Sequence, residues 1–347
     1  MAKSTAPEPL QQLKQEIRAK SPARCYVFWG EETYLLRHYC QQLYKALIDP
    51  MTEEFNFHRM NGETYSTDAL IDSVEALPMM AEHTLVQVDE IDLFKLPEEE
   101  RERLCALLED LPDYCCLVFT YETTPYKPDK RQKRLYEALT HNAVQVEFAK
   151  QSPRELSAWI SRHFLSYGKR IAPDLCAYLI DITGGTMTAL GSEIPKIAAY
   201  AVDEQVRRSD IDAVTEPVLD AVVFQLSDAI GGGDYALALA KLQVLLKMQQ
   251  EPIAILGAIG GQLRRISAAR TLLDRGQGSD ALMRLTGLKD YPARKTMALA
   301  KRFPAGLCRE ALLLCEETDW KMKTSFDSSQ RLLELLILRL AQEAKHG

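Results

Sequence analysis

The sequence predicts a mixed α/β domain followed by an all-α region. Between about residues 21 and 149, short apolar segments typical of strands alternate with longer segments of helical periodicity. From Ser152 onward the strand pattern stops and only helical segments follow. This alternation favours a doubly wound, mainly parallel sheet, in which helices connect neighbouring strands. We therefore predict a five-stranded sheet, a small helical domain and a larger helical bundle.

Five strands and four intervening helices are expected in the α/β domain. The strands are runs rich in apolar and β-branched residues, and the helices carry apolar residues at intervals of three and four. The expected strands are RCYVFWG (24–30), FNFHRMN (55–61), HTLVQVDE (83–90), CCLVFTY (115–121) and AVQVEFA (143–149). The expected helices are EETYLLRHYCQQLYKAL (31–47), STDALIDSVEAL (66–77), PEEERERLCALLEDL (97–111) and DKRQKRLYEAL (129–139).

The remaining chain is expected to form two helical domains. Ser152 and Glu155 make a capping box that starts the first helix after the sheet. The last helical segment, residues 330–342, is apolar on nearly all sides, so we expect it to be buried inside a bundle or between subunits. The predicted domains are an α/β domain (1–149), a helical domain (150–212) and a helical bundle (213–347).

Composition indicates an ordinary soluble protein. The chain has 347 residues, of which 46% are hydrophobic and 26% charged, with a net charge of -7. That charge argues against wholesale coating of nucleic acid, although a local basic patch would be hidden in the sum. No run of about 18 apolar residues occurs, so a membrane span is not expected. The first fifteen residues lack the apolar core of a signal peptide, and we expect a cytoplasmic protein.

The eight cysteines do not form a metal or redox motif. None stands in a C-x-x-C pair, and we expect reduced, buried thiols. Cys308 and Cys315 are seven residues apart, which places both on one face of a helix. No Ser-His-Asp or Cys-His arrangement suggests catalysis, and we predict no metal site. The cysteines are Cys25, Cys40, Cys105, Cys115, Cys116, Cys176, Cys308 and Cys315.

The turn after the first strand looks like a phosphate-binding loop without its working parts. A Walker A motif, G-x-x-x-x-G-K-[ST], combines backbone N–H donors, a lysine for the phosphates and a hydroxyl for Mg²⁺. Gly30 begins the turn here, but Glu31, Glu32 and Thr33 follow, and neither the second glycine nor the lysine is present. Two carboxylates facing a triphosphate would cost several kcal/mol where water is partly excluded. We expect this position not to bind ATP.

Two further positions fit the same interpretation. The third strand ends in Asp89 and Glu90, where a Walker B motif would place a magnesium-holding acid and a water activator. Acidic residues often end strands as solvated caps, and without the lysine we do not expect a magnesium site. Thr188 stands in the helical domain where an ATPase of this layout would extend an arginine towards the γ-phosphate.

In the order of its elements and in several segments, the chain resembles the delta subunit of the bacterial DNA polymerase III clamp loader. No single motif is decisive, but the succession covers nearly the whole sequence. The segments are YVFWGEETYLLR, ALPMMAEHTLVQVDE, PDKRQKRLYEAL, VEFAKQSPRELSAWI, GGTMTALGSEIPKIAAYA and QEPIAILGAIGGQLRRI. The resemblance implies an AAA+ fold with a degenerate nucleotide site, a helical lid (150–212) and a C-terminal helical collar (213–347).

The resemblance also implies a role and a set of partners. A delta subunit binds the ring-shaped beta sliding clamp and opens it for loading onto primed DNA. Its other partners are the gamma/tau motor subunits, the delta-prime subunit and primer-template DNA in the assembled complex. ATP is bound by the partner subunits, so we expect no cofactor on this chain. We expect no intrinsic catalysis, although the chain would belong to a DNA-directed DNA polymerase holoenzyme.

The segment after the second predicted helix is the candidate clamp-binding element. Pro78 disfavours helical geometry at Leu77, so the helix should end there and leave Met79 and Met80 partly exposed. In the resembling family this place carries a hydrophobic pair that inserts into a pocket on the clamp, and the two methionines match it. The alternative is that both methionines close the core beneath the helix.

A basic run follows the fourth strand and offers a possible DNA contact. Lys127, Lys130, Arg131, Lys133 and Arg134 stand against one acid in this segment. One interpretation is that these side chains form a solvent-exposed helix surface with no binding role. The other is that they contact the phosphates of primer-template DNA.

Arginines in the expected collar present the same ambiguity. Arg264, Arg265 and Arg270 lie close together in one helical segment. The collar helices from about Leu219 onward should carry the permanent subunit contacts, since their apolar faces exceed what one small bundle can hide.

Three other classes stay open. An active AAA+ ATPase would need an unconventional phosphate site. The delta-prime subunit shares the resembling fold but usually carries a zinc-binding cysteine cluster and a Ser-Arg-Cys finger, which the sequence lacks. A helical adaptor without clamp binding would keep residues 77–80 buried.

Overall fold

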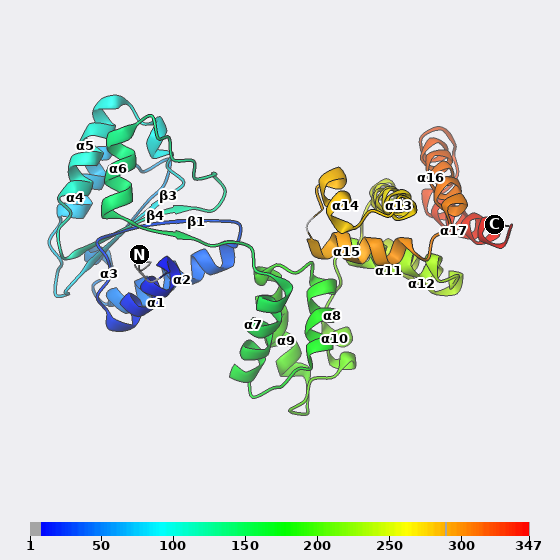
Figure 1. The fold of residues 1–347 in the computed structure, drawn as a ribbon. Helices are drawn as coiled ribbons and strands as arrows, with labels where there is room; N and C mark the ends of the chain where they lie inside the picture. Colours follow the sequence, from blue (N-terminus) through cyan, green and yellow to red (C-terminus); the bar gives the residue numbers. More distant parts are fainter. Residues whose placement is uncertain (1–7, 289, 347) are drawn as a thin grey trace, which may run out of the picture. The chain divides into compact units, whose positions relative to one another are not determined.

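The computed structural model describes residues 8–288 and 290–346. The chain divides into two compact units, Met1–Ser152 and Pro153–Gly347. The first contains the sheet and the second is helical (Figure 1).

The first unit alternates strands and helices along the chain, as predicted. Its strands are β1 (Cys25–Trp29), β2 (Phe57–Met60), β3 (Thr84–Asp89), β4 (Cys115–Tyr121) and β5 (Val144–Glu147). Its helices are α1 (Pro9–Ala19), α2 (Thr33–Leu47), α3 (Glu53–Asn56), α4 (Thr67–Glu75), α5 (Glu98–Glu109) and α6 (Lys133–Asn142), with a 3₁₀ turn η1 (Leu93–Lys95).

The five strands form one parallel sheet in the order β2-β3-β4-β1-β5. The doubly wound, mainly parallel five-stranded sheet expected from the sequence is therefore confirmed. Because β1 pairs with both β4 and β5, it lies inside the sheet, and its carboxyl end is flanked by those of two neighbours. In sheets of this kind, ligand sites lie outside the carboxyl ends of the strands.

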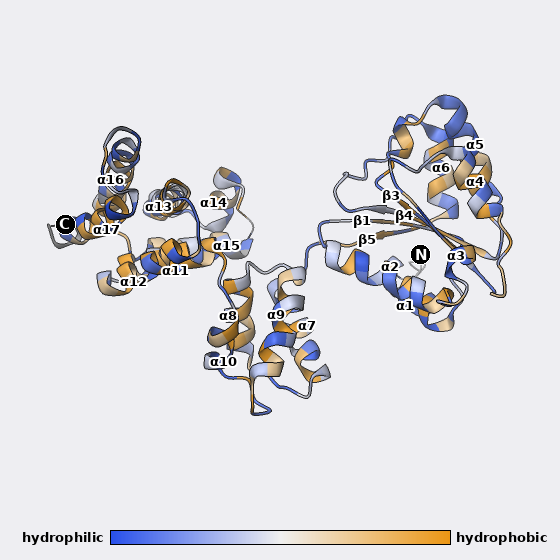
Figure 2. Cartoon of the chain, turned by 180° about the vertical axis from the view of Figure 1, so that it is seen from behind, coloured by the Kyte–Doolittle hydropathy of each residue, from blue (hydrophilic) through white to orange (hydrophobic). Residues whose placement is uncertain are grey.

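Helices cover both faces of the sheet, and alternate residues of β1 pack into the cores on opposite faces. Tyr26 and Phe28 point into the core beneath α1 and α2. Cys25 and Val27 point into the core shared with α4, α5 and α6. This alternation follows from the two-residue period of a strand, and Figure 2 shows the strands as the apolar centre of the unit.

The largest departures of the observed helices from the predicted ones are at three places. α1 and α3 were not expected from the sequence, because α1 is short of apolar residues and α3 has only one turn. The sequence predicts that the basic run lies in a helix beginning at residue 129, but α6 begins at Lys133. The carboxylate of Asp129 accepts hydrogen bonds from the backbone N–H and the guanidinium of Arg131, which form a turn instead of a helix start.

The second unit is a succession of helices. Its first group is α7 (Pro153–Ser166), α8 (Pro173–Thr183), α9 (Met187–Tyr200) and α10 (Arg208–Val214). Then come α11 (Leu219–Gly231), α12 (Tyr235–Lys247), α13 (Pro252–Asp274), α14 (Ser279–Thr286), α15 (Asp290–Ala300), α16 (Ala305–Thr324) and α17 (Ser329–His346). The expected boundary at residue 212 falls inside α10, and the division into lid and collar stays a prediction.

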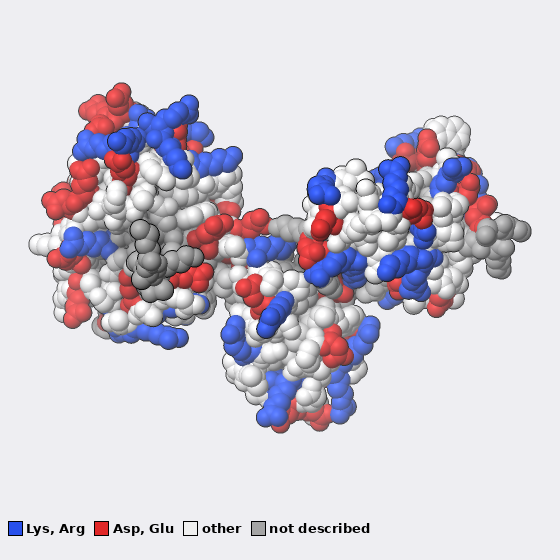
Figure 3. Space-filling view, in the orientation of Figure 1, with Lys and Arg blue, Asp and Glu red and all other residues white. Residues whose placement is uncertain are grey.

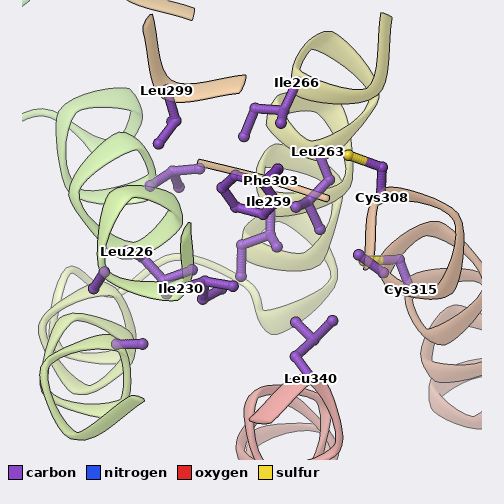
Figure 4. Close-up of a cluster of buried hydrophobic side chains, with 14 of the residues drawn as sticks. Leu226, Ile230, Ile259, Leu263, Ile266, Leu299, Phe303, Cys308, Cys315 and Leu340 are labelled. Atoms are coloured by element: carbon purple, nitrogen blue, oxygen red, sulfur yellow. The ribbon is translucent and has the colours of Figure 1, made fainter. Parts of the chain in front are cut away.

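One hydrophobic core joins the helices from α11 to α17. Figure 4 shows residues of several helices meeting in it, with Phe303 close to Ile259 and Leu263. Cys308 and Cys315 lie on the buried face of α16, as their spacing predicts. All eight cysteines are free, and seven of them are buried.

The final helix is only partly buried within this chain. Leu333, Leu336 and Leu340 of α17 are buried in the core, but Leu335 and Leu338 are exposed on the other side. The sequence predicts that this helix is buried either inside a bundle or between subunits. Complete burial inside this bundle does not occur. Among the described residues, no helix has both the length and the apolarity needed to cross a membrane.

Candidate functional site

The turn after β1 is packed against the main chain that follows β5. Gly30 has a φ of 138°, and a Cβ atom at this position would overlap the carbonyl oxygen of Phe148. The backbone N–H of Glu32 donates to that same oxygen at 2.9 Å, and the N–H of Phe148 donates to the carbonyl of Trp29 at 2.7 Å. In a phosphate-binding loop the backbone N–H groups point at the anion. Here the N–H of Glu32 is already bonded to the protein.

A side-chain carboxylate occupies the start of α2. Glu32 is the N-cap residue of this helix and is buried, whereas Glu31 is exposed and Thr33 is the first helical residue. Burial raises the pKa of the Glu32 carboxyl, while Lys150 and the backbone N–H of Tyr34 oppose that rise. A helix N-terminus attracts anions. The positive end of α2 is therefore next to a carboxylate of the chain itself.

Asp89, the last residue of β3, is held by neighbouring side chains. Its carboxylate accepts from the Nε of Arg59 at 2.6 Å, from the amide of Gln87 at 2.7 Å and from the hydroxyl of Thr120 at 2.6 Å. Among the described residues, no group of three His, Cys, Asp or Glu side chains is arranged to hold a metal ion.

Glu90 binds the loop that follows β4. Its carboxylate accepts from the backbone N–H groups of Glu122 at 2.6 Å, Thr123 at 3.0 Å and Thr124 at 2.7 Å, and from the hydroxyl of Thr123 at 3.0 Å. Burial raises the pKa of the Glu90 carboxyl, but these donors outweigh burial and hold the pKa below its usual value. Glu90 therefore serves as an anchor for this loop.

Thr188 lies far along the chain from these residues, in the second unit. It is exposed in the first turn of α9, where Thr186 is the N-cap and its hydroxyl accepts from the N–H of Ala189.

The candidate clamp-binding residues form an exposed turn between α4 and β3. α4 ends at Glu75, two residues before Leu77, in accord with the effect of Pro78 on the residue before it. The side chains of Leu77, Met79 and Met80 are 76%, 48% and 89% exposed. The alternative in which both methionines close the core is therefore wrong.

The backbone of this turn is held in place by a buried asparagine from α3. The Nδ2 of Asn56 donates to the carbonyl of Met79 at 2.9 Å, and the N–H of Met79 donates to the Oδ1 of Asn56 at 2.8 Å. Met80 follows in the left-handed region, with a φ of 53°. The Tyr114 hydroxyl donates to the carbonyl of Glu75 at 3.0 Å. The sequence did not reveal the role of Asn56, because it lies in a segment that reads as a strand.

Most of the basic run is neutralised locally. Arg131 pairs with Asp129, Lys133 lies 3.8 Å from Glu137, and Arg134 contacts Glu102 and Glu109 of α5. Figure 3 shows acidic side chains next to basic ones on this unit. Lys130 lies over the ring of Tyr136, 5.8 Å from its centroid, and Lys127 is exposed. In the second unit, Arg264 and Arg265 are exposed on α13 and Arg270 pairs with Asp274.

Two family models match this chain. One is described as "DNA polymerase III, delta subunit" and covers residues 26–149. The other, "DNA polymerase III delta subunit, C-terminal domain", covers residues 220–340. Together they span more than half of the chain. The chain belongs to the DNA polymerase III delta subunit family.

Relatives in this family match along nearly their whole length. The DNA polymerase III subunit delta of Bacillus subtilis is 26% identical over 322 residues, which cover 91% of this chain and 92% of the relative. A probable DNA polymerase III subunit delta of Aquifex aeolicus is 22% identical, with 96% of each chain covered. The solved structure of the Bacillus subtilis DNA clamp loader delta protein has a TM-score of 0.67 at 22% identity and covers 96% of this chain and 99% of its own. That likeness supports the fold.

Proposed function

We propose that this delta-family chain binds the ring of the sliding clamp through residues 77–80 and favours the open ring, so that the clamp can be loaded onto primed DNA. The observation that carries the proposal is the exposure of Met79 and Met80 on a turn whose backbone Asn56 holds. Methionine is unbranched and polarizable and adapts well to an apolar pocket. An apolar pair on a fixed turn is suited to anchoring a transient complex.

The size of the contact is adequate for an anchor. Met79 is 48% exposed and Met80 is 89% exposed, so burying what remains of these two side chains contributes about 2 to 4 kcal/mol before the cost of ordering is subtracted. A subunit that prefers the clamp curvature of the open ring shifts the closed-to-open equilibrium by its differential affinity for the two states. This chain would then need no hydrolysis of its own.

Nucleotide is assigned to the partner subunits in this proposal. The turn at Gly30 lacks the lysine of a phosphate loop, and the N–H of Glu32 is bonded to the Phe148 carbonyl. ATP bound by the gamma/tau motor subunits would instead control access to Met79 and Met80. The rival reading, an active ATPase, predicts tight magnesium-dependent ATP binding by the isolated chain, which isothermal titration calorimetry would detect.

The collar side of the chain is proposed to meet the motor and delta-prime subunits in the cytoplasm. Exposed apolar side chains on α16 and α17 support this assignment: Leu313, Trp320, Leu335 and Leu338. Apolar groups of this size on a surface favour burial against a partner.

Primer-template DNA is a further proposed partner, through Lys127 and Lys130. These two cations support the contact because the other members of the basic run are in ion pairs. Replacing both lysines with glutamate should weaken DNA binding by the assembled loader and reduce its salt dependence. An unchanged salt dependence would assign the run to a solvated surface.

The test of clamp binding uses the double variant Met79→Ala plus Met80→Ala, with purified clamp and no nucleotide. The affinity should fall at least about 30-fold, which corresponds to about 2 kcal/mol. The matched control is Leu165→Ala plus Val202→Ala, which removes two exposed apolar side chains from the second unit and should leave the affinity unchanged. A folded Met79/Met80 variant that binds the clamp as well as the parent protein would refute the proposal.

A further inference from the structure

Among the described residues of the first unit, the exposed large hydrophobic side chains lie in two segments, residues 51–55 and 77–80. The first segment adds Met51, 91% exposed, and Phe55, 52% exposed, to the three apolar side chains of the turn. Scattered single hydrophobic residues are normal on a surface, but their concentration in one place marks an interaction site.

Asn56 brings the two segments together. Its side chain makes both hydrogen bonds to Met79 described above, and its Nδ2 also donates to the hydroxyl of Thr52 at 2.9 Å. The side chain is fully buried. Phe55 directly precedes Asn56 in the chain, so its Cα atom lies about 3.8 Å from that of the residue that holds Met79. The 51–55 segment and the turn are therefore tied together at Asn56.

The sheet explains why these segments meet. Residues 51–55 precede β2 and residues 77–80 precede β3, and the two strands pair in parallel with Phe57 opposite Leu85. The amino ends of β2 and β3 therefore lie at the same end of the sheet along the strand direction. The altered nucleotide site around Gly30 and Asp89 lies at the carboxyl ends of the strands, which is the opposite end. α3 ends at Asn56 and β2 begins at the next residue, Phe57.

The composition of this region indicates the kind of partner. The exposed methionines among the described residues are Met51, Met79 and Met80, and all three lie here. Acidic residues border the apolar side chains, and they too are exposed: Glu53, Glu54, Glu75 and Glu82. Such a surface fits an apolar pocket rimmed by lysine and arginine.

We infer that the surface which contacts the clamp is composite: Met51 and Phe55 belong to it together with Met79 and Met80, and Asn56 is the positioning residue that fixes the two segments relative to each other. The inference rests on the proposed function and extends it. Because Asn56 bonds both the N–H and the carbonyl of Met79, the turn is held in its binding conformation before the partner arrives, which lowers the ordering cost of association.

The contact itself is tested with Met51→Ala plus Phe55→Ala in the full chain and purified clamp. We expect an affinity about 10-fold weaker, whereas the Leu165/Val202 control variant stays unchanged. Methionine oxidation provides a second measurement on the unmodified protein. Met51 should be oxidised rapidly by hydrogen peroxide in the free chain and protected in the complex, along with Met79 and Met80.

The positioning role is tested with Asn56→Ala and with Asn61→Ala as a matched control. Asn61 is exposed and makes its hydrogen bonds within its own turn. Asn56→Ala should weaken clamp binding about 5- to 10-fold and speed hydrogen exchange at the Met79 amide. Binding to the motor and delta-prime subunits should not change, which shows that the chain remains folded. Asn56→Asp keeps the acceptor for the Met79 N–H but loses the donor to the Met79 carbonyl and buries a carboxylate beside it, so it should not restore the affinity.

The outcomes separate this inference from the proposed function. If the Met79/Met80 variant binds the clamp normally, the proposed function fails. If that variant loses binding while the Met51/Phe55 variant stays within twofold of the parent and Met51 remains oxidisable in the complex, the composite surface is refuted. If Asn56→Ala frees the Met79 amide without weakening binding, the positioning role is refuted.

Discussion

Replacing Glu90 with alanine should destabilise the first unit by about 2 to 3 kcal/mol, although Glu90 directly follows a strand, where acidic residues are often only solvated caps. The change removes the acceptor for three consecutive backbone N–H groups, those of residues 122–124. Two of these N–H groups, in Glu122 and Thr124, form part-buried hydrogen bonds. Each is left without its protein partner in the variant.

The magnitude follows from these two part-buried donors. An unsatisfied buried N–H costs about 1 to 3 kcal/mol, and we take the lower end, about 1 to 1.5 kcal/mol for each donor, because water reaches this loop. The exposed N–H of Thr123 finds water instead and adds little. Glu90→Gln retains one acceptor oxygen but turns an amide NH₂ towards a second donor, so it should cost about half as much as the alanine variant.

Chemical denaturation monitored by tryptophan fluorescence measures the effect. Trp29 lies 4.9 Å from the ring of Tyr126, which belongs to the same loop. The other two tryptophans, Trp159 and Trp320, are in the second unit and would be replaced with phenylalanine, so that the signal reports the first unit alone. The pKa of the Glu90 carboxyl is lowered on folding from 4.5. Its contribution is thus fully present above pH 4.5 and is lost as the pH falls through the folded pKa.

Two results would refute this reasoning. A Glu90→Ala variant as stable as the parent chain would show that the loop does not depend on the carboxylate. A stability difference between parent and Glu90→Gln that persists undiminished well below pH 4 would contradict the assigned role of the charge.

Two further predictions concern the turn after β1. Gly30→Ala should destabilise the first unit by about 3 kcal/mol or more, because Gly30 has a φ of 138° and the added methyl group would overlap the carbonyl oxygen of Phe148. A denaturation midpoint equal to that of the parent protein would contradict this prediction. Glu32→Gln should stabilise the unit at pH 7, since burial raises the pKa of the Glu32 carboxyl on folding. A carboxyl group whose pKa is raised on folding lowers the stability of the folded state above the folded pKa, but not below its unfolded pKa near 4.5. The stability gained by Glu32→Gln should therefore vanish in thermal unfolding at pH 4.

The sequence predicted the sheet because its signal is local. Apolar runs such as CCLVFTY are long enough to mark buried strands, and helical periodicity separates them. The exposure of Met79 and Met80 could also be predicted, since Pro78 ends the helix before them. α3 could not be predicted, because a single turn has no periodicity.

Hydrogen bonds between residues far apart in the chain could not be predicted from the sequence. The hydrogen bond from Glu32 to Phe148 joins residues 116 positions apart and depends on no particular side chain. Asn56 and Met79 are 23 positions apart, and the asparagine fits a strand segment equally well. Glu90 resembled part of a magnesium site because residue type alone does not show which donors surround a carboxylate.

The hydrogen bond between Glu32 and Phe148 bears on any attempt to re-engineer this chain as an ATPase. Restoring a lysine and a second glycine would supply side-chain chemistry, yet the N–H of Glu32 would still be bonded to the Phe148 carbonyl oxygen and could not point at a phosphate. The path of the polypeptide after β5 would have to be redrawn as well. The obstacle to nucleotide binding would then lie in the course of the backbone, where point mutation is least able to remove it.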